Sequence, residues 1–267
     1  MSVLLLKISP PLQSWGVASK FYQTRSTSRA PSKSGVIGMI CAAFGWPRTH
    51  DLSRLRAVRM GVRIDEPGRL EMDYHTAASH PERDGGAKGL STTKVTKRWY
   101  LTDAAFVVGL ESGDEAFLGE IRDALMKPRW CLYAGRKSCP VNHDLVMGIV
   151  DATLEEALAP GNTPLIVLTD GARKPSANAR KVEALIESND GDDLITVEDE
   201  PLSFDPSNRR FASRTVKRTW YERGETVRPS MSTWVEETSS PAEPEEAPSE
   251  ATWVDEAFMP TVAGTGE

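Results

Sequence analysis

The chain reads QSWGVASKFYQTRSTSRAPSKSGVIGMICAAFGW over residues 13–46, and this stretch predicts more of the architecture than any other. A polar, basic loop passes here into an apolar run with helical spacing, which Gly45 ends. Ser32 or Ser34 is the expected N-terminal cap. We therefore predict a short helix over residues 33–45.

The start of this predicted helix is a candidate anion site. Backbone N–H groups without partners and the positive end of the helix dipole attract phosphates. Cations and an aromatic residue precede it, as in loops that bind a nucleic-acid backbone. The candidate RNA contacts here are Gln13, Trp15, Lys20, Arg25, Arg29, Lys33 and Ser34. On the residues alone, a core helix with a solvated loop is an equal alternative, and Trp15 could anchor the loop on the core instead.

Residues 77–97 predict the tip of a long β-hairpin that has no core of its own. Strand-like segments at 70–76 and 92–102 flank three glycines and few apolar residues. Such an extension either wanders or docks on a partner. Cations outnumber acids nearby, so Lys97 and Arg98 are candidate RNA contacts.

Two further segments carry candidate RNA contacts. The turn YAGRKS at 133–138 holds Arg136 and Lys137, and a guanidinium can bind phosphate with two parallel hydrogen bonds. Arg214 belongs to a basic cluster with aromatic neighbours over residues 209–221. A solvated connection or a solvated terminal strand is the alternative at each place.

Charge is unevenly distributed along the chain. The 267 residues contain 38 acids and 32 bases, a net charge of −6, but residues 224–267 hold ten acids and one base. The remaining 28 acids and 31 bases make residues 1–223 mildly basic. This balance is compatible with RNA binding but does not establish it.

Several functional classes find no support in the sequence. The three cysteines form no C-x-x-C pair, which indicates buried free thiols and neither a disulfide framework nor a zinc site. Motifs for phosphate loops, nucleophile elbows and paired carboxylates are absent, so we expect no cofactor, metal or catalytic residue. The apolar run at the N-terminus is too short for a signal peptide or a membrane span, and a cytoplasmic location is expected.

Periodicity predicts a mixture of strands and helices. The expected strands are 3–8, 57–64, 104–110, 165–169 and 194–198, and the expected helices after the first are 114–126 and 178–187. Strands and helices in this order are compatible with an α+β, ferredoxin-like fold, which RNA-recognition modules share.

Five motifs stand in a fixed order along the chain. After QSWG and the predicted helix come DYHT at 73–76, TKRWYL at 96–101, YAGRKSCP at 133–140, and finally DEP and RFASR within 199–214. Together they resemble the Cas-five (CasD) family of type I-E CRISPR Cascade complexes, over most of residues 3–223. The resemblance implies a ferredoxin-like (RRM-like) RAMP domain at 1–150, with a protruding hairpin thumb at about 77–97. It also implies a smaller β-rich half at 151–223.

The resemblance also implies a function. Family members of this type are non-catalytic subunits that bind the 5′ handle of crRNA and cap the filament of backbone subunits. The thumb would dock on the backbone subunit, and the large Cascade subunit and, indirectly, target DNA would be further partners. The alternative, known in type I-C relatives, is a metal-independent endoribonuclease that processes repeat RNA. Tyr74 and His75, with Lys88 or Lys94, would be its candidate groups, but adjacent residues on a strand point to opposite faces.

The tail, residues 224–267, has too few apolar residues to offset the cost of ordering, so disorder is the expected state. The resemblance does not extend into it. Two alternatives remain open: short apolar and acidic clusters around Trp234 and Trp253 could dock on a partner, or the acids could compete weakly with RNA for the basic body.

Overall fold

The computed structural model describes residues 1–16, 24–78, 93–166 and 181–223. Residues Met1–Pro229 form one compact unit, built on a nine-stranded sheet with helices packed against it. The α+β class expected from the sequence is therefore confirmed. None of the helices in these ranges is long and apolar enough to cross a membrane.

The centre of the sheet follows the chain order strand, helix, strand, strand, helix, strand. The elements are β1 (Ser2–Ile8), α1 (Lys33–Phe44), β6 (Arg59–Ala78), β7 (Thr93–Ser112), α3 (Glu115–Met126) and β8 (Val146–Asp151). The four strands lie in the order β6-β7-β1-β8, and every neighbouring pair is antiparallel. This is the βαββαβ connectivity of ferredoxin-like domains.

Shorter and later elements extend this centre. Two short strands, β2 (Leu12–Gln13) and β4 (Thr24–Arg25), pair with β7, while β3 (Trp15–Gly16) pairs with β5 (Thr27–Ser28) in a separate two-stranded sheet. Beyond β6 lie β9 (Lys181–Glu187), β11 (Arg210–Glu222) and β10 (Leu194–Ser203), in that order. Two short helices, α2 (Ser53–Arg56) and α4 (Leu154–Leu158), complete the described elements.

Both faces of the sheet are buried at its centre. Alternate residues of β1 enter different cores, with Leu4 and Leu6 packing in the cluster under α1 and α3 and Val3 and Leu5 packing in a second cluster with α4. The second cluster also contains residues of β9, such as Ile186. A boundary near residue 150 therefore does not separate two cores, because the later strands share both the sheet and a core with the first half.

Two elements predicted after residue 150 differ from the structure or lie largely outside its described residues. A helix was expected over 178–187, but β9 runs over Lys181–Glu187 with Val182, Ala184 and Ile186 buried. That prediction is wrong because the apolar residues alternate, which is the period of a half-buried strand. The strand expected over 165–169 lies largely outside the described residues, as does most of the predicted hairpin tip.

The predicted helix at 33–45 is confirmed with its caps. The Ser32 side chain accepts a hydrogen bond from the Gly35 N–H, and Gly45 ends α1 with a left-handed φ of 71°. Gly35 also makes room for a neighbour, since a Cβ there would lie 2.8 Å from the Trp15 ring. Local sequence signals thus fix both ends of α1.

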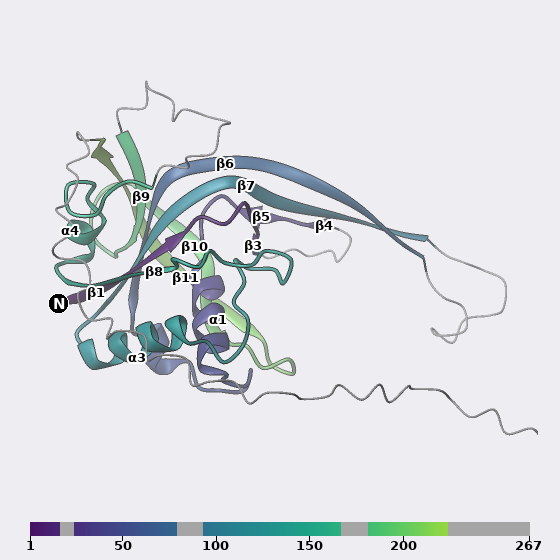
Figure 1. Cartoon of the computed structure of the whole chain (residues 1–267), viewed down its shortest axis with the longest axis horizontal. Helices are drawn as coiled ribbons and strands as arrows, with labels where there is room; N and C mark the ends of the chain where they lie inside the picture. Colours follow the sequence, from purple (N-terminus) through teal and green to yellow (C-terminus); the bar gives the residue numbers. More distant parts are fainter. Residues whose placement is uncertain (17–23, 79–92, 167–180, 224–267) are drawn as a thin grey trace, which may run out of the picture. The chain divides into compact units, whose positions relative to one another are not determined.

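The pair β6–β7 is a long two-stranded hairpin, with residues paired from Arg59↔Glu111 out to Ala78↔Thr93. Figure 1 shows the two strands continuing side by side well beyond the other strands of the sheet. Residues directly opposite one another share a face. One face of the outer part therefore carries Leu70, Met72, Tyr74, Val95, Lys97 and Trp99, and the other carries Asp73, His75, Lys94 and Arg98. The outer hairpin is a ribbon with a largely apolar face and a charged face.

Candidate nucleic-acid interface

The N-terminus of α1 is occupied by a carboxylate of the chain itself. The Lys33 N–H donates a hydrogen bond to Asp199 Oδ2 at 2.7 Å. Arg214 holds the same carboxylate with two bonds, Nε to Oδ1 at 2.6 Å and Nη2 to Oδ2 at 3.1 Å. The helix end does attract an anion, as its dipole predicts, but the anion is Asp199 on β10.

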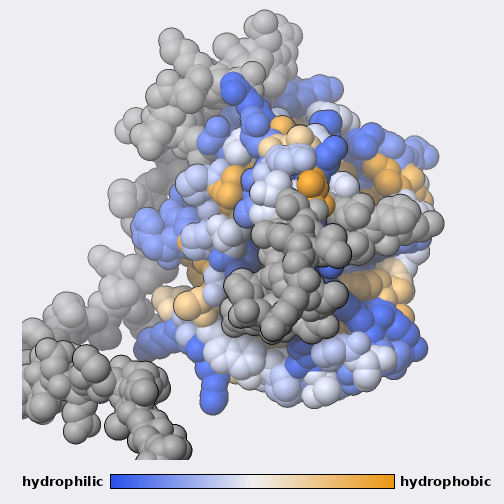
Figure 2. All heavy atoms as spheres, turned by 90° about the vertical axis from the view of Figure 1, so that its right-hand side faces the viewer, coloured by the Kyte–Doolittle hydropathy of each residue, from blue (hydrophilic) through white to orange (hydrophobic). Residues whose placement is uncertain are grey.

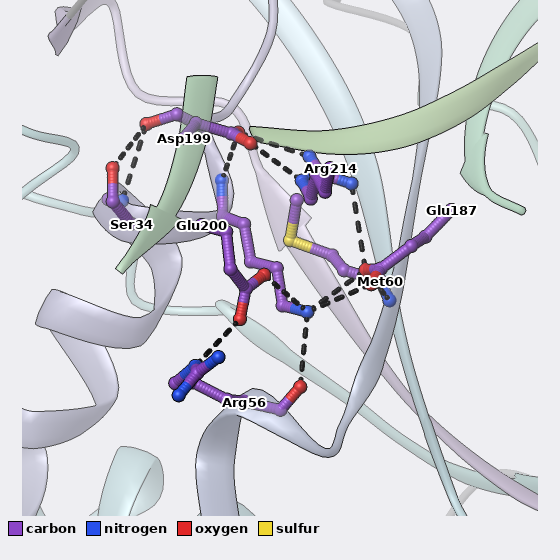
Figure 3. A network of polar contacts seen from close by, with 10 residues as sticks. Ser34, Arg56, Met60, Glu187, Asp199, Glu200 and Arg214 are labelled. Atoms are coloured by element: carbon purple, nitrogen blue, oxygen red, sulfur yellow. Dashed lines mark hydrogen bonds and ion pairs between the residues drawn. The ribbon is translucent and has the colours of Figure 1, made fainter. Parts of the chain in front are cut away.

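The side chain of Lys33 lies in the interior, with 2% of its surface exposed. Its ammonium is 3.0 Å from Glu187 Oε2 and 2.8 Å from Glu200 Oε2, and it donates to the Arg56 carbonyl. Figure 3 shows these groups converging from α1, β9, β10 and β11. We call Lys33, Glu187, Asp199, Glu200 and Arg214 the buried ion network. It joins α1 to the outer strands of the sheet.

Four candidate RNA contacts are therefore corrected to interior residues. Lys33 and Arg214 belong to the buried ion network, and the Arg214 side chain is 9% exposed. Gln13 and Trp15 are fully buried, where the Trp15 indole N–H donates to Gln13 Oε1 at 3.0 Å. Gln13 in turn donates to the Ala104 carbonyl at 2.8 Å. Trp15 thus anchors the loop on the core, which was the structural alternative for this residue.

The remaining candidates belong to several parts of the chain. Lys20 lies outside the described residues. Ser34 is half-buried near Ser32, and Arg29 is exposed in the loop before α1. The structure brings the others together around the outer part of β7, with Lys97 on one face of the hairpin and Arg98 on the other. We name Arg25, Lys97, Arg98, Arg136 and Lys137 the basic cluster.

Backbone pairing assembles the first part of the basic cluster. Strand β4 runs parallel to β7 with Thr24 opposite Lys97 and Arg25 opposite Arg98. Both arginine side chains are exposed. Because Arg25 and Arg98 are register partners, their guanidinium groups emerge from adjacent strands.

The turn at 133–138 contributes the second part. The guanidinium of Arg136 lies 4.7 Å from the centre of the Tyr100 ring and donates from Nη2 to the Arg25 carbonyl at 2.9 Å. Gly135 has φ of +89°, and a Cβ there would lie 1.8 Å from the Ser14 carbonyl oxygen. Only glycine fits this approach, which holds the turn against Ser14 between β2 and β3. Lys137 of the same turn is exposed.

The basic cluster is not neutralised by the described part of the chain. No carboxylate there lies within ion-pairing distance of Arg25, Lys97, Arg98, Arg136 or Lys137. By contrast, most other arginines of the sheet are paired, such as Arg59 with Glu111 and Arg218 with Glu183. The one acid directly opposite Arg98 is Asp73, whose carboxylate lies 3.7 Å from His75 Nε2. The cluster therefore presents net positive charge to solvent.

Two observations near the cluster concern groups that catalysis could use. Burial raises the pKa of the Cys139 thiol above its ordinary value, and Ser138 and Arg136 offset only part of this effect. The thiol is therefore neutral near pH 7 and is no nucleophile. Tyr74 and His75 are consecutive on β6 and point to opposite faces, so they do not form a joint acid–base pair.

Sequence reasoning missed two residues that shape this site. Tyr100 supports the Arg136 guanidinium, and the Ser14 hydroxyl donates to the Trp99 carbonyl while its N–H donates to the Ala134 carbonyl. Spacing offered a signal for Tyr100 alone, because Arg98 and Tyr100 are two apart on one strand and share a face. The role of Ser14 depends on contacts between distant segments.

Comparison with known proteins identifies the family. The family model described as "CRISPR-associated protein (Cas_Cas5)" matches residues 3–217. The chain is 37% identical over 166 residues to the CRISPR system Cascade subunit CasD of Escherichia coli (strain K12), covering 57% of this chain and 73% of that protein. The chain therefore belongs to the Cas5 family of CRISPR-associated proteins, as the order of motifs predicted.

Solved structures agree with this assignment. A chain of a CRISPR RNA-guided surveillance complex superposes with a TM-score of 0.67 at 33% identity, over 82% of this chain and 90% of that one. A second structure, described as a Cas protein, gives a TM-score of 0.61 at 35% identity, over 82% of this chain and 95% of that one.

Proposed function

We propose that this protein is a non-catalytic subunit of a type I-E CRISPR surveillance complex, and that its basic cluster binds the 5′ handle of the guide RNA. The observation that carries the proposal is the assembly of five cations from three segments around the outer part of β7, without carboxylate partners in the described residues. Family membership and the Cascade subunit among its relatives support the assignment.

The geometry suits a single strand of RNA. Phosphates bind to Arg and Lys by charge, while bases stack on exposed rings without sequence preference. The apolar face of the hairpin holds Tyr74 and Trp99 close to Lys97 along the same strands. Arg136 lies over the Tyr100 ring and donates from Nη2 to the Arg25 carbonyl, so it adds positive charge beside Arg25.

Removing two cations of the basic cluster should weaken RNA binding and flatten its salt dependence. In a chain with Arg25→Ala and Arg98→Ala, we expect the slope of log affinity against log salt to fall by about 1.4, because each lost contact to single-stranded RNA removes about 0.7. Both side chains are exposed and unpaired in the described residues, so stability should change by less than about 0.5 kcal/mol each. Fluorescence anisotropy with handle RNA across a salt series measures the slope.

A matched control removes the same charge elsewhere. Arg48→Ala with Lys127→Ala neutralises two exposed cations outside the basic cluster, one shortly after α1 and one just after α3. The control should keep the slope of the unaltered chain. Equal slopes for the two double variants would show that RNA responds to overall charge, and the basic cluster would lose its role.

We also propose that the apolar face of the hairpin docks on the backbone subunit of the complex, placing this chain at the end of a filament beside the large subunit. Met72 is 44% and Tyr74 57% exposed, on a pair of strands that stands clear of the core. The hairpin side of the molecule shows hydrophobic patches among hydrophilic ones (Figure 2). Exposed apolar residues gathered on one face are typical of an interaction site.

Polar substitutions on this face should prevent assembly without unfolding the chain. With Met72→Ser and Tyr74→Ser we expect at least tenfold less recovery of the backbone subunit in co-purification, since about 1.4 kcal/mol of lost interface energy is sufficient. Thermal unfolding should be nearly unchanged. The control, Glu71→Ser with Asp73→Ser, alters the opposite face of the same strand. The docking proposal is wrong if both variants recover the partner equally.

A further inference from the structure

A second exposed surface lies where the C-terminal end of α1 meets the segment that follows α3. The Arg129 N–H donates a hydrogen bond to the Ala43 carbonyl at 2.9 Å. The Arg129 side chain packs against Gly45, where a Cβ would lie 2.1 Å from Arg129 Cδ. These contacts hold the two segments together. We call Arg48, Met126, Lys127, Arg129 and Trp130 the α1–α3 patch.

The α1–α3 patch exposes two large apolar side chains. Met126 is 61% exposed and Trp130 is 52% exposed. Among the large hydrophobic residues that the structure describes, only Met1 is more exposed than Met126. The Trp130 indole stacks on no ring of the described residues. Large apolar side chains that are exposed close together are typical of a surface that a partner covers.

The cations of the patch are available to a partner. Arg48, Lys127 and Arg129 are exposed, and none of them pairs with a carboxylate of the described chain. By contrast, Arg54 on α2 pairs with both Asp114 and Glu120. The patch therefore combines apolar side chains with net positive charge, and the complementary partner is acidic.

The residue types of the patch favour a protein over a nucleic acid. Trp46 lies against Phe44 and His50, with ring centroids 4.3 Å and 3.9 Å away and the rings nearly parallel. Two rings cannot share one face of an indole at these separations, so both faces of Trp46 are covered. Single-stranded nucleic acids need successive free rings on which bases stack. Met, Trp and Arg, which dominate the patch, are enriched in protein interfaces.

The patch is separate from the surfaces assigned to guide RNA and to the backbone subunit. Trp15, which anchors the loop before β4, packs on Gly35 at the start of α1. The patch lies at the other end of this helix, which has 12 residues and is therefore about 18 Å long. It shares no residue with the basic cluster or with the apolar face of the hairpin. A further partner can therefore bind it.

We propose that the α1–α3 patch docks a second protein subunit of the surveillance complex, different from the backbone subunit, which presents an apolar side chain flanked by carboxylates. The inference rests on the proposed place of this chain in that complex. Met126 and Trp130 cover the apolar side chain, while Arg48 and Lys127 pair with the carboxylates. Because the Arg129 contacts already hold the segment beside α1, less ordering is needed on binding.

The first test removes the apolar part of the patch in the complete complex. The tagged full chain is co-expressed with the other subunits and the guide RNA, and the recovery of each subunit is measured. Met126→Ser with Trp130→Ser should reduce the recovery of one subunit at least about tenfold, because tryptophan anchors dominate interface energies. The backbone subunit and the guide RNA should be retained. The control, Leu194→Ser with Trp220→Ser, alters side chains that are 42% and 52% exposed elsewhere and should recover every subunit.

The second test reverses charge on exposed side chains only, so it remains informative if the serine variant fails to fold. Arg48→Glu with Lys127→Glu should reduce the recovery of the same subunit at least about tenfold, and salt should shrink this loss by screening the repulsion. The control, Arg209→Glu with Arg210→Glu, reverses two exposed cations outside the patch. In the unaltered complex, carbodiimide should cross-link Lys127 to a carboxylate of that subunit.

The docking proposal is wrong if both patch variants recover every subunit, and the RNA role of the basic cluster would then stand. It is also overturned if the charge-reversed variant recovers every subunit but binds a labelled RNA or duplex DNA more weakly, since the occupant would be a nucleic acid. Dimers of the unaltered chain in sedimentation that Met126→Ser with Trp130→Ser abolishes would make the occupant a second copy. An unaltered chain that recovers neither subunits nor guide RNA would contradict the proposed function and this inference together.

Discussion

Replacing Lys33 with methionine is expected to destabilise the fold by about 3 kcal/mol, because two carboxylates would remain in the interior without their ammonium partner. The Lys33 side chain is 2% exposed, and those of Glu200 and Glu187 are 10% and 24% exposed. Both acids keep other partners, such as Arg56 for Glu200. The expected loss in the free energy of unfolding is therefore at the lower end of the range for a broken buried ion pair. The melting temperature should fall by about 6–12 °C.

The same variant separates two interpretations of Lys33. If the ammonium were a phosphate contact, Lys33→Met would flatten the salt dependence of RNA binding by about 0.7 and leave stability nearly unchanged. In the structure it contacts Glu187 and Glu200, so we expect the opposite pattern, with an unchanged slope below the melting temperature. Lys127→Met, which alters an exposed cation, is the control and should change neither quantity.

Local signals explain why α1 was predictable and the role of Lys33 was not. Ser32, Gly45 and the helical spacing of apolar residues lie within fifteen positions of one another, and they fix the helix wherever it packs. The partners of Lys33 come from β9 and β10, more than 150 residues away in the chain. From the sequence alone, a basic residue in the first turn of a helix indicates a phosphate contact. The structure shows instead that Lys33 pairs with Glu187 and Glu200.

The exposed cations of the basic cluster, unlike Lys33, could be identified from the sequence. Lys97, Arg98, Arg136 and Lys137 were identified from composition and motifs, and backbone pairing through β4 then placed Arg25 beside them. An exposed cation on a strand or turn stays accessible to a ligand, because no distant segment covers it. A buried cation does not, since its environment is set by segments far apart in sequence.

The burial of residues in the first part of β6 could not be predicted fully from the alternation of apolar and polar residues. In the strand predicted over 57–64, the apolar Val58, Met60, Val62 and Ile64 alternate with other residues, a pattern typical of a strand with one buried and one solvated face. Helix α4 covers that second face, where a Cβ on Gly61 would lie 2.7 Å from Leu158 Cδ1. Arg63 is consequently fully buried, although its position in the pattern is that of an exposed residue.

Arg63 is expected to be among the most sensitive positions in the chain. All five of its N–H donors are bonded: Nε and Nη2 to the two oxygens of Asp65, and the rest to the carbonyls of Leu158, Thr163 and Pro164. Arg63→Met would leave a buried carboxylate and three carbonyls without these donors. We expect a loss of at least about 4 kcal/mol in the free energy of unfolding, measured by urea denaturation.

Three companion variants separate charge from hydrogen bonding at Arg63. Adding Asp65→Leu to Arg63→Met removes the unpaired carboxylate and should recover part of the loss, while the carbonyls stay unpaired. Arg63→Lys keeps the charge but has three donors in place of five, so it should fall between the unaltered chain and Arg63→Met. Arg69→Met, on the exposed part of the same strand, should cost less than about 0.5 kcal/mol. Equal stabilities for Arg63→Met and Arg69→Met would mean that the five donors contribute nothing, and that the segment from Leu158 to Pro164 is held on the sheet by apolar contacts alone.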